Sequence, residues 1–366
     1  MVRRMVRESA SSTVRDHDRS GLIDCDVHNS VPSIEVLYPY LPDLWRDYIV
    51  ERGVGSLEPN YYPAGAPLSA RPGAAPPSGS PPGSDLDLLR GQLLDSWDVE
   101  YAILNCLYGV QLVHNEDWAA AMARAVNDWQ VAEWLDKEPR LRASIVVPTQ
   151  NPEMAAEEIE RLGDHPGFVQ ALLLVRTEMP LGKRHYWPIY EAAERHDLAI
   201  GIHAGGSPGN PITPVGWPSH YLEDYVSLAQ AFQSQLVSLV SEGVFAKFPG
   251  LRAVLIEGGF TWLPSLMWRF DKNWKGLRGE VAWVDRLPSE IIHEHVRLTI
   301  QPVDEPPNQE YLLQTMEQIG SEEMLLFSTD YPHWHFDERE DALPVELPPE
   351  LERKILVENA RALYGI

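Results

Sequence analysis

Short apolar runs recur along the chain, and segments with helical periodicity separate most of them. Eight of these runs are short and almost continuously apolar, as buried strands are. They are LIDCDVH (22–28), YAILN (101–105), ASIVV (143–147), QALLLV (170–175), AIGIH (199–203), AVLIE (253–257), VRLTI (296–300) and LLFSTD (325–330). Continuous apolar strands that alternate with helices are typical of a parallel sheet covered on both faces.

The segments between these runs supply the helices of the predicted fold. Apolar side chains recur at helical spacing over residues 117–138, 186–197, 221–247 and 349–363. Asn151 followed by Pro152 marks a helix start, with a capping side chain and a proline at the first helical position. Eight strand–helix units predict a distorted (β/α)8 barrel of the TIM type, forming one domain over residues 21–366. The alternative is an open doubly wound sheet, but no G-x-G-x-x-G follows the first strand.

One segment interrupts this alternation. Residues 58–84, EPNYYPAGAPLSARPGAAPPSGSPPGS, are too rich in proline and glycine for a helix or a central strand. They lie between the first strand and its helix, so we expect a long loop at the carboxyl face of the barrel. It is either an active-site lid or a disordered insertion. Residues 1–20 are rich in arginine and serine without an apolar segment, which predicts a disordered tail and not a secretion signal.

The acidic charge of the chain argues against nucleic acids and anionic membranes as binding partners. The chain has 54 acidic and 30 basic side chains, a formal net charge of −24, which repels nucleic acids and anionic membranes. No apolar run reaches the roughly 18 residues that a transmembrane helix needs. The two cysteines, Cys25 and Cys106, form neither a disulfide framework nor a zinc motif. We therefore expect a cytoplasmic protein that acts on a small molecule.

The first apolar run carries unexpected polar residues. Alternate residues of a barrel strand face inward, which predicts that Asp24, Asp26 and His28 share the inner face and that the intervening residues face the helices. Chemistry in TIM barrels is located at the carboxyl ends of the strands. Asp26 and His28 stand at that end, whereas Asp24 lies one layer deeper and is expected to be structural.

Other strands end in residues of the same kind. His203 ends the fifth run, Glu257 ends the sixth and Asp330 ends the eighth. Together with Asp26 and His28 they would surround one point at the barrel mouth, where unpaired charges are costly and like charges repel. A divalent cation resolves both problems, and two imidazoles with carboxylates suit Zn²⁺, Fe²⁺ or Mn²⁺. We predict one such ion, or two bridged by Glu257.

Further residues near strand ends are candidates for contact with a substrate. Arg176 ends the fourth run and either clamps a substrate carboxylate or carbonyl or forms a structural ion pair. His333 follows Asp330 closely and is either a proton carrier, an extra metal ligand or a loop residue. His220, Trp217 and Trp334 lie in or near loops at the same face, where they would bind substrate and wall an apolar pocket.

Several motifs carry a resemblance to a known family. They are IDCDVH, GIHAGG, IEGGFTWLP, FSTDYPHWHFD and the closing ENARALYGI, with STDYPH the most specific. The sequence over residues 20–366 resembles the amidohydrolase superfamily, in the branch of aminocarboxymuconate semialdehyde decarboxylase and the resorcylate-type decarboxylases. The resemblance implies that Asp26, His28 and His203 bind the metal and that the chain forms a homodimer. It also implies that Asp330 contacts the metal and accepts or delivers a proton.

The sixth strand departs from the pattern of this branch. Close relatives often place a histidine there, whereas this chain has Glu257. The carboxylate-rich set favours metal-dependent hydrolysis of a carbonyl compound, an amide, ester, lactone or thioester, through a metal-activated water. Asp330, helped by His333, would move the proton, and Glu257 would complete the metal site. The alternative is metal-dependent, non-oxidative decarboxylation of an aromatic or unsaturated acid, and a third hypothesis is a non-catalytic binding protein.

Overall fold

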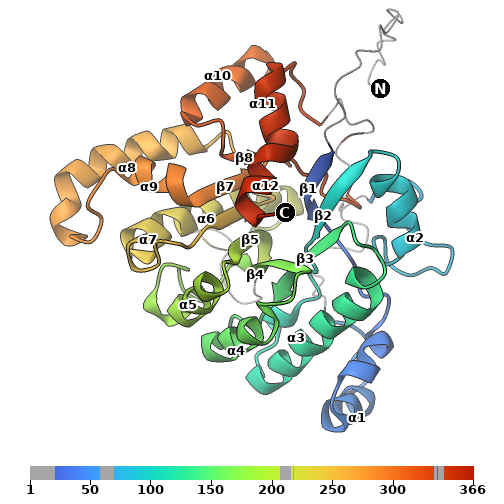
Figure 1. Ribbon diagram of the computed structural model, residues 1–366. Helices are drawn as coiled ribbons and strands as arrows, with labels where there is room; N and C mark the ends of the chain where they lie inside the picture. Colours follow the sequence, from blue (N-terminus) through green and yellow to red (C-terminus); the bar gives the residue numbers. More distant parts are fainter. Residues whose placement is uncertain (1–20, 58–69, 207–215, 217, 334–335, 337–341) are drawn as a thin grey trace, which may run out of the picture.

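Eight parallel strands in sequence order form the centre of the molecule, and helices surround them (Figure 1). The computed structural model describes residues 21–57, 70–206, 216, 218–333, 336 and 342–366. The strands are β1 (Leu22–Val27), β2 (Val99–Leu104), β3 (Leu141–Val146), β4 (Phe168–Arg176), β5 (Ala199–Gly206), β6 (Ala253–Ile256), β7 (Val296–Thr299) and β8 (Leu325–Leu326). Each coincides with one of the predicted apolar runs, so the predicted (β/α)8 barrel is confirmed.

Backbone hydrogen bonds between β1 and the segment that follows β8 nearly close the sheet. The Cys25 N–H donates to the carbonyl of Phe327 at 2.9 Å, and the Asp330 N–H donates to the carbonyl of Asp26 at 3.0 Å. Closure leaves no exposed sheet edge along these segments. It also places Asp26 and Asp330, which are 304 positions apart in the chain, side by side.

The helices form the outer layer. They are α1 (Asp43–Arg52), α2 (Leu86–Leu89), α3 (Glu116–Gln130), α4 (Pro152–Leu162), α5 (Trp187–Arg195), α6 (Tyr221–Ser241), α7 (Val244–Lys247), α8 (Leu263–Leu277), α9 (Pro288–His295), α10 (Glu310–Ile319), α11 (Pro349–Arg353) and α12 (Asn359–Tyr364). Helix α4 begins as predicted, because Asn151 Oδ1 accepts the Met154 N–H at 3.0 Å and Pro152 is the first helical residue. Within the described part of the chain, no helix combines the length and hydropathy needed to cross a membrane.

An apolar cluster fills part of the barrel interior at the amino ends of the strands. Ile23 and Cys25 of β1 pack in one buried cluster with Ala199 of β5, which lies on the opposite side of the barrel. Only interior side chains can meet across a barrel, so Ile23 and Cys25 face inward, contrary to the predicted alternation. The β1–β2 register shifts between Asp24 and Val27, and such an irregularity lets Cys25 and Asp26 both lie on the inner side. Helix α12 covers this end of the barrel (Figure 1).

The predicted loop over residues 58–84 is described from residue 70 onward. Its described part is hydrogen bonded to the barrel at two places. The Arg71 N–H donates to the carbonyl of Pro332 at 2.8 Å, and the Ser30 N–H donates to the carbonyl of Gly83 at 3.0 Å. Residues 70–84 are therefore fixed to both segments that flank the barrel mouth. The rest of the loop and the predicted tail, residues 1–20, lie outside the described residues.

Candidate metal centre

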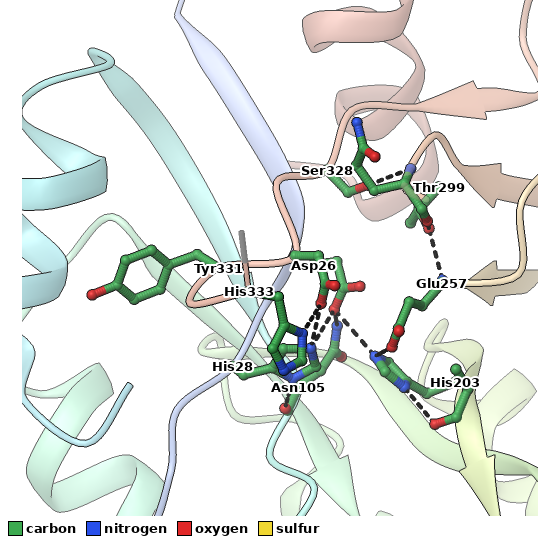
Figure 2. Close-up of polar contacts among 12 residues, drawn as sticks. Asp26, His28, Asn105, His203, Glu257, Thr299, Ser328, Tyr331 and His333 are labelled. Carbon is green, nitrogen blue, oxygen red and sulfur yellow. Dashed lines mark hydrogen bonds and ion pairs between the residues drawn. The ribbon is translucent and has the colours of Figure 1, made fainter. Parts of the chain in front are cut away.

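Three strands bring four potential ligands to one point at the carboxyl face of the barrel. Asp26 and His28 come from the end of β1, His203 from β5 and Glu257 from the residue after β6 (Figure 2). All four are buried, and one ligand atom from each lies within 4.8 Å of those of the others. The structure thus brings together four of the five residues predicted as ligands, and Asp330 lies in contact with them.

Both histidines are held so that the same ring nitrogen faces the centre. His28 Nδ1 lies 2.9 Å from the carbonyl oxygen of Asn105, and His203 Nδ1 lies 2.8 Å from that of Ala204. A carbonyl oxygen only accepts, so each Nδ1 carries the proton. His203 Nε2 then faces Asp26 Oδ1 at 3.3 Å, and His28 Nε2 faces the same oxygen at 3.7 Å. Histidine ligands to metals are oriented in this way.

Asp26 has one satisfied and one unsatisfied oxygen. Its Oδ1 accepts the Asn105 Nδ2–H at 2.9 Å. Its Oδ2 is buried and finds no hydrogen-bond partner among the described residues. A buried carboxylate oxygen without a partner is costly, and a cation would satisfy it. The donor set of Asp26, His28 and His203 therefore fits a divalent transition metal.

Asp330 links this group to His333. Its Oδ1 lies 2.8 Å from His28 Nε2 and 2.9 Å from His333 Nδ1. Asp330 is fully buried, whereas 19% of the His333 side chain is exposed. The pair therefore connects the interior of the site to its solvent-facing side.

Glu257 is positioned by its own backbone and by helix α6. Its N–H donates to Thr299 Oγ1 at 3.0 Å, and its Oε1 accepts the Tyr225 hydroxyl at 3.2 Å. Its Oε2 lies 3.7 Å from His203 Nε2. Tyr225 thus uses one oxygen of Glu257 and leaves the other directed toward the centre.

The electrostatics of the group also fit a cation. Burial, together with the nearby Asp330, raises the pKa of Glu257 to about 8. Burial opposes a charged imidazole at His28, but Asp26 and Asp330 outweigh it and raise the pKa of His28 to about 10. Asp26 likewise raises the pKa of His203 against the effect of burial. These groups retain protons to limit the repulsion between carboxylates, and a bound divalent ion would replace those protons.

Two of the carboxylates sit on unusual backbone. Glu257 has φ 59° and Asp330 has φ 60°, in the left-handed region that residues other than glycine seldom adopt. Such a conformation costs about 1–3 kcal/mol and persists only where its surroundings enforce it. Both carboxylates contact histidines of the site, with Asp330 Oδ1 at 2.8 Å from His28 Nε2 and Glu257 Oε2 at 3.7 Å from His203 Nε2. The strain is consistent with a functional requirement for these two positions.

Other predicted substrate-binding residues are placed elsewhere or lie outside the described part. Arg176 Nη2 pairs with the carboxylate of Asp224 on α6, which is the structural ion-pair alternative. The His220 side chain is 81% exposed, and its Nδ1 lies 3.0 Å from Glu223 Oε2 at the start of α6. Trp217 and Trp334 are not among the described residues.

Sequence reasoning missed several residues that build the site. Asn105 holds both Asp26 and His28, and it ends the second apolar run just as His203 ends the fifth, so the same rule could have found it. Tyr225 lies within α6 and had no such signal. Asp24 is structural, as expected, and accepts the Thr329 hydroxyl at 2.6 Å and the Thr329 N–H at 3.0 Å.

Comparison with known proteins places this geometry in a family. The family model described as Amidohydrolase matches residues 23–366. The chain belongs to the amidohydrolase family. It is 29% identical over 304 residues to the gamma-resorcylate decarboxylase of Polaromonas sp., a match that covers 77% of this chain and 88% of that relative. It is 26% identical to the gamma-resorcylate decarboxylase of Rhodococcus jostii, with the same coverage of 77% and 88%.

Solved structures share the fold of this family member. The 2,6-dihydroxybenzoate decarboxylase from Rhizobium has a TM-score of 0.66 at 24% identity, covering 94% of this chain and 98% of that one. The dihydroxybenzoic acid decarboxylase from Polaromonas sp., solved with manganese and 2-nitroresorcinol, has a TM-score of 0.65 at 23% identity, covering 94% and 97%. The 5-carboxyvanillate decarboxylase from Sphingomonas paucimobilis has a TM-score of 0.67 at 21% identity, covering 94% and 99%.

These relatives correct the leading functional prediction from the sequence. They are named as decarboxylases, so the prediction of a hydrolase acting on an amide, ester, lactone or thioester is wrong. The error has a physical origin. A carboxylate-rich donor set specifies that a cation binds, but it does not specify which bond of the substrate breaks, and Glu257 alone could not decide between the two reactions.

Proposed function

We propose that this chain is a metal-dependent, non-oxidative decarboxylase of an aromatic carboxylic acid. The observation that carries the proposal is the unpaired, buried Oδ2 of Asp26 beside two imidazoles, His28 and His203, whose Nδ1 atoms are anchored on carbonyls. The naming of the curated relatives as decarboxylases supports the choice of reaction.

The site would hold one divalent ion through Asp26, His28 and His203, with Asp330 and Glu257 beside it. We propose one ion and not two bridged by Glu257, because Tyr225 already donates to Oε1 of that residue. Manganese is the first candidate, since the Polaromonas neighbour was solved with it. When bound, the ion supplies positive charge for the substrate carboxylate and an adjacent oxygen.

Asp330 and His333 would manage the proton of the reaction. Decarboxylation adds one proton to the ring carbon and releases CO₂, and the electron pair of the broken C–C bond returns to the ring. Asp330 Oδ1 already shares hydrogen bonds with His28 and His333, at 2.8 and 2.9 Å. His333 is partly exposed, so it can recover a proton from solvent and pass it to the buried Asp330.

The proposed substrate is a benzoic acid with a hydroxyl group next to the carboxylate. The neighbours with 2,6-dihydroxybenzoate in their names act on an acid of this type. The carboxylate oxygen and the neighbouring hydroxyl oxygen of such an acid could both bind one cation. Asp330, beside the cation, would then supply the proton to the ring. The net charge of −24 means that the bound ion would also provide local attraction for an anionic substrate.

The experiment is a carbon dioxide assay on the metal-loaded chain. Purified protein is incubated with Mn²⁺ and a panel of ortho-hydroxybenzoates, including 2,6-dihydroxybenzoate and 5-carboxyvanillate, and CO₂ and the arene are quantified. We expect release from at least one acid, loss after chelation and recovery with Mn²⁺. Asp26→Asn should abolish release, whereas His220→Asn, at an exposed position, should leave it within about twofold. A chain that binds Mn²⁺ but decarboxylates no acid of the panel would refute the proposal.

We also propose that the chain forms a homodimer in the cytoplasm, as the family resemblance implies. Exposed apolar side chains on neighbouring outer helices support the dimer. Leu222 and Val226 on α6 are 73% and 68% exposed, and Trp268 on α8 is 56% exposed. Sedimentation velocity on the full chain would show twice the monomer mass, and a monomer at micromolar concentration would contradict the dimer.

A further inference from the structure

A line of polar side chains runs from the half-buried Tyr364 of helix α12 through the barrel interior, where the other members are fully buried, to the candidate metal centre. The Tyr364 hydroxyl donates to Gln170 Oε1 at 3.0 Å, and Gln170 Nε2 donates to Ser144 Oγ at 2.8 Å. Ser144 Oγ donates to Asn105 Oδ1 at 2.5 Å, and Asn105 Nδ2 donates to Asp26 Oδ1 at 2.9 Å. We call Tyr364, Gln170, Ser144 and Asn105 the interior network.

Every donor in the interior network points toward Asp26. A carboxylate only accepts, so Asn105 must present its amide N–H to Asp26 and its oxygen to Ser144. Gln170 Nε2 also lies 3.1 Å from that oxygen, which fixes the orientation of the Gln170 amide and leaves its Oε1 for the Tyr364 hydroxyl. The polarity is thus determined from end to end. Hydrogen bonds aligned in this way polarise one another in a low-dielectric interior.

Asn105 connects this network to two of the proposed metal ligands. Its side chain donates to Asp26, and its carbonyl oxygen accepts from His28 Nδ1 at 2.9 Å. Asn105, Ser144 and Gln170 are each 0% exposed, so bulk water does not compete for these bonds. The bond to Asp26 Oδ1 also fixes the carboxylate so that Oδ2, its unpaired oxygen, remains available to a cation.

The network is an unusual interior for this fold. Barrel interiors are filled mainly by layers of branched apolar side chains, and buried polar groups reduce stability unless all are satisfied. The space for Gln170 depends on Gly201 of β5, where a Cβ would lie 3.0 Å from Gln170 Cδ and Nε2. Gly201 leaves room for the polar side chain of Gln170, and Tyr364 on α12 completes the line of hydrogen bonds. This arrangement indicates that the interior network does more than fill space.

We infer that Tyr364, Gln170, Ser144 and Asn105 are positioning residues that hold Asp26 and His28 in the geometry that binds the metal. The C-terminal helix α12 is thereby coupled to the metal centre through the whole depth of the barrel. The inference rests on the metal site of the proposed function and is independent of which bond of the substrate breaks.

The test compares two tyrosines in the full chain by measuring the dissociation constant for Mn²⁺ by titration calorimetry. Tyr364→Phe removes only the hydroxyl that starts the network. Tyr190→Phe is the control, because Tyr190 likewise donates one hydrogen bond, to the carbonyl of Leu181 at 2.6 Å on the outer layer, and is fully buried where Tyr364 is half-buried. We expect Tyr364→Phe to raise the dissociation constant by about 3–10-fold and Asn105→Leu by about 10–100-fold. Tyr190→Phe should leave it unchanged even if both tyrosine variants lose similar thermal stability.

A second measurement separates a connected network from independent defects. Because Tyr364 and Ser144 belong to one line of bonds, the double variant Tyr364→Phe/Ser144→Ala should weaken Mn²⁺ binding by less than the product of the single effects. Equal Mn²⁺ affinity of the two tyrosine variants, or fully multiplicative effects, would overturn the inference. Failure of the parent chain to bind Mn²⁺ would overturn it together with the metal site. A parent that binds Mn²⁺ without decarboxylating would refute only the proposed reaction.

Discussion

Asp330 is the residue on which most of the proposed proton chemistry depends. One of its oxygens accepts hydrogen bonds from both His28 and His333, and its backbone is in the left-handed region. It also lies close enough to Glu257 to raise the pKa of that side chain. Asp330 therefore lies beside the proposed metal site and is connected to solvent through His333, and this position carries a cost in backbone strain and charge repulsion.

The variant Asp330→Asn tests the role of this carboxylate in catalysis and its effect on stability independently. Asp330→Asn should lower kcat by about 10²–10⁴-fold, because the amide cannot deliver a proton. The melting temperature without added metal should change little, because the loss of a negative charge beside Glu257 offsets the weaker hydrogen bonds to His28 and His333. Steady-state kinetics and thermal unfolding of the same preparation check both parts. A kcat within tenfold of the parent would show that Asp330 does not carry the proton.

At the scale of elements, the loop over residues 70–84 is an integral part of the site. It is hydrogen bonded to Ser30 and Pro332, which follow His28 and Asp330 in the chain. Gly83 has φ 79°, and a Cβ on it would lie 2.5 Å from the carbonyl oxygen of His28. The loop backbone therefore approaches a proposed ligand more closely than any side chain would allow.

Two glycines of this loop form a matched pair of tests. Gly83→Ala should displace the His28 backbone and weaken Mn²⁺ binding by about tenfold or more, the range found when groups that orient metal ligands are lost. Gly79→Ala is the control, since Gly79 has φ 84° but a Cβ on it would meet nothing within 4 Å. It should show only the backbone strain, about 1 kcal/mol, with unchanged affinity. Equal Mn²⁺ affinity of the two variants would mean that the loop does not position His28.

A second element-scale feature stabilises the start of β3. The carboxylate of Glu138 accepts from Arg140 Nε at 2.8 Å and from Arg90 Nε at 2.9 Å. The hydrogen bonds from Arg140 come first among the causes that lower the pKa of Glu138 to about 2, against the opposing effect of burial. Because the folded-state pKa lies below the ordinary value of 4.5, this group stabilises the fold above that pH. The stabilisation is lost as the pH falls from about 4.5 toward 2.

The pH dependence of one variant tests this assignment. Glu138→Gln should lower the free energy of unfolding by about 1–3 kcal/mol at pH 7, because two arginines lose a buried partner. The difference from the parent should shrink as the pH is lowered below about 4.5, where the parent carboxylate itself gains a proton. Urea unfolding at several pH values measures it. A difference that is the same at pH 7 and pH 3 would exclude the ionised carboxylate as its source.

At the scale of the whole molecule, the sequence predicted the barrel because its pattern is dominated by burial. The strands are largely buried, so most appear as nearly continuous apolar runs, and polar residues at the strand ends indicate the site. The orientation of Cys25 could not be predicted, because it depends on a register shift between two strands. The exposure of the His220 side chain could not be predicted, because the apolar pattern does not show which way a residue between two elements points. The reaction could not be derived from the ligand set and required the relatives.

The most direct test of the proposed decarboxylation is a single reaction in D₂O followed by proton and carbon-13 NMR. The Mn²⁺-loaded chain is incubated with 2,6-dihydroxybenzoate carrying ¹³C in its carboxyl group. We predict loss of the acid, release of the labelled carbon as CO₂ and bicarbonate, and one deuterium on the ring carbon that carried the carboxylate. If the signals of the acid persist, and if those of the other ortho-hydroxybenzoates also persist while Mn²⁺ is bound, the chain is not a decarboxylase of this class.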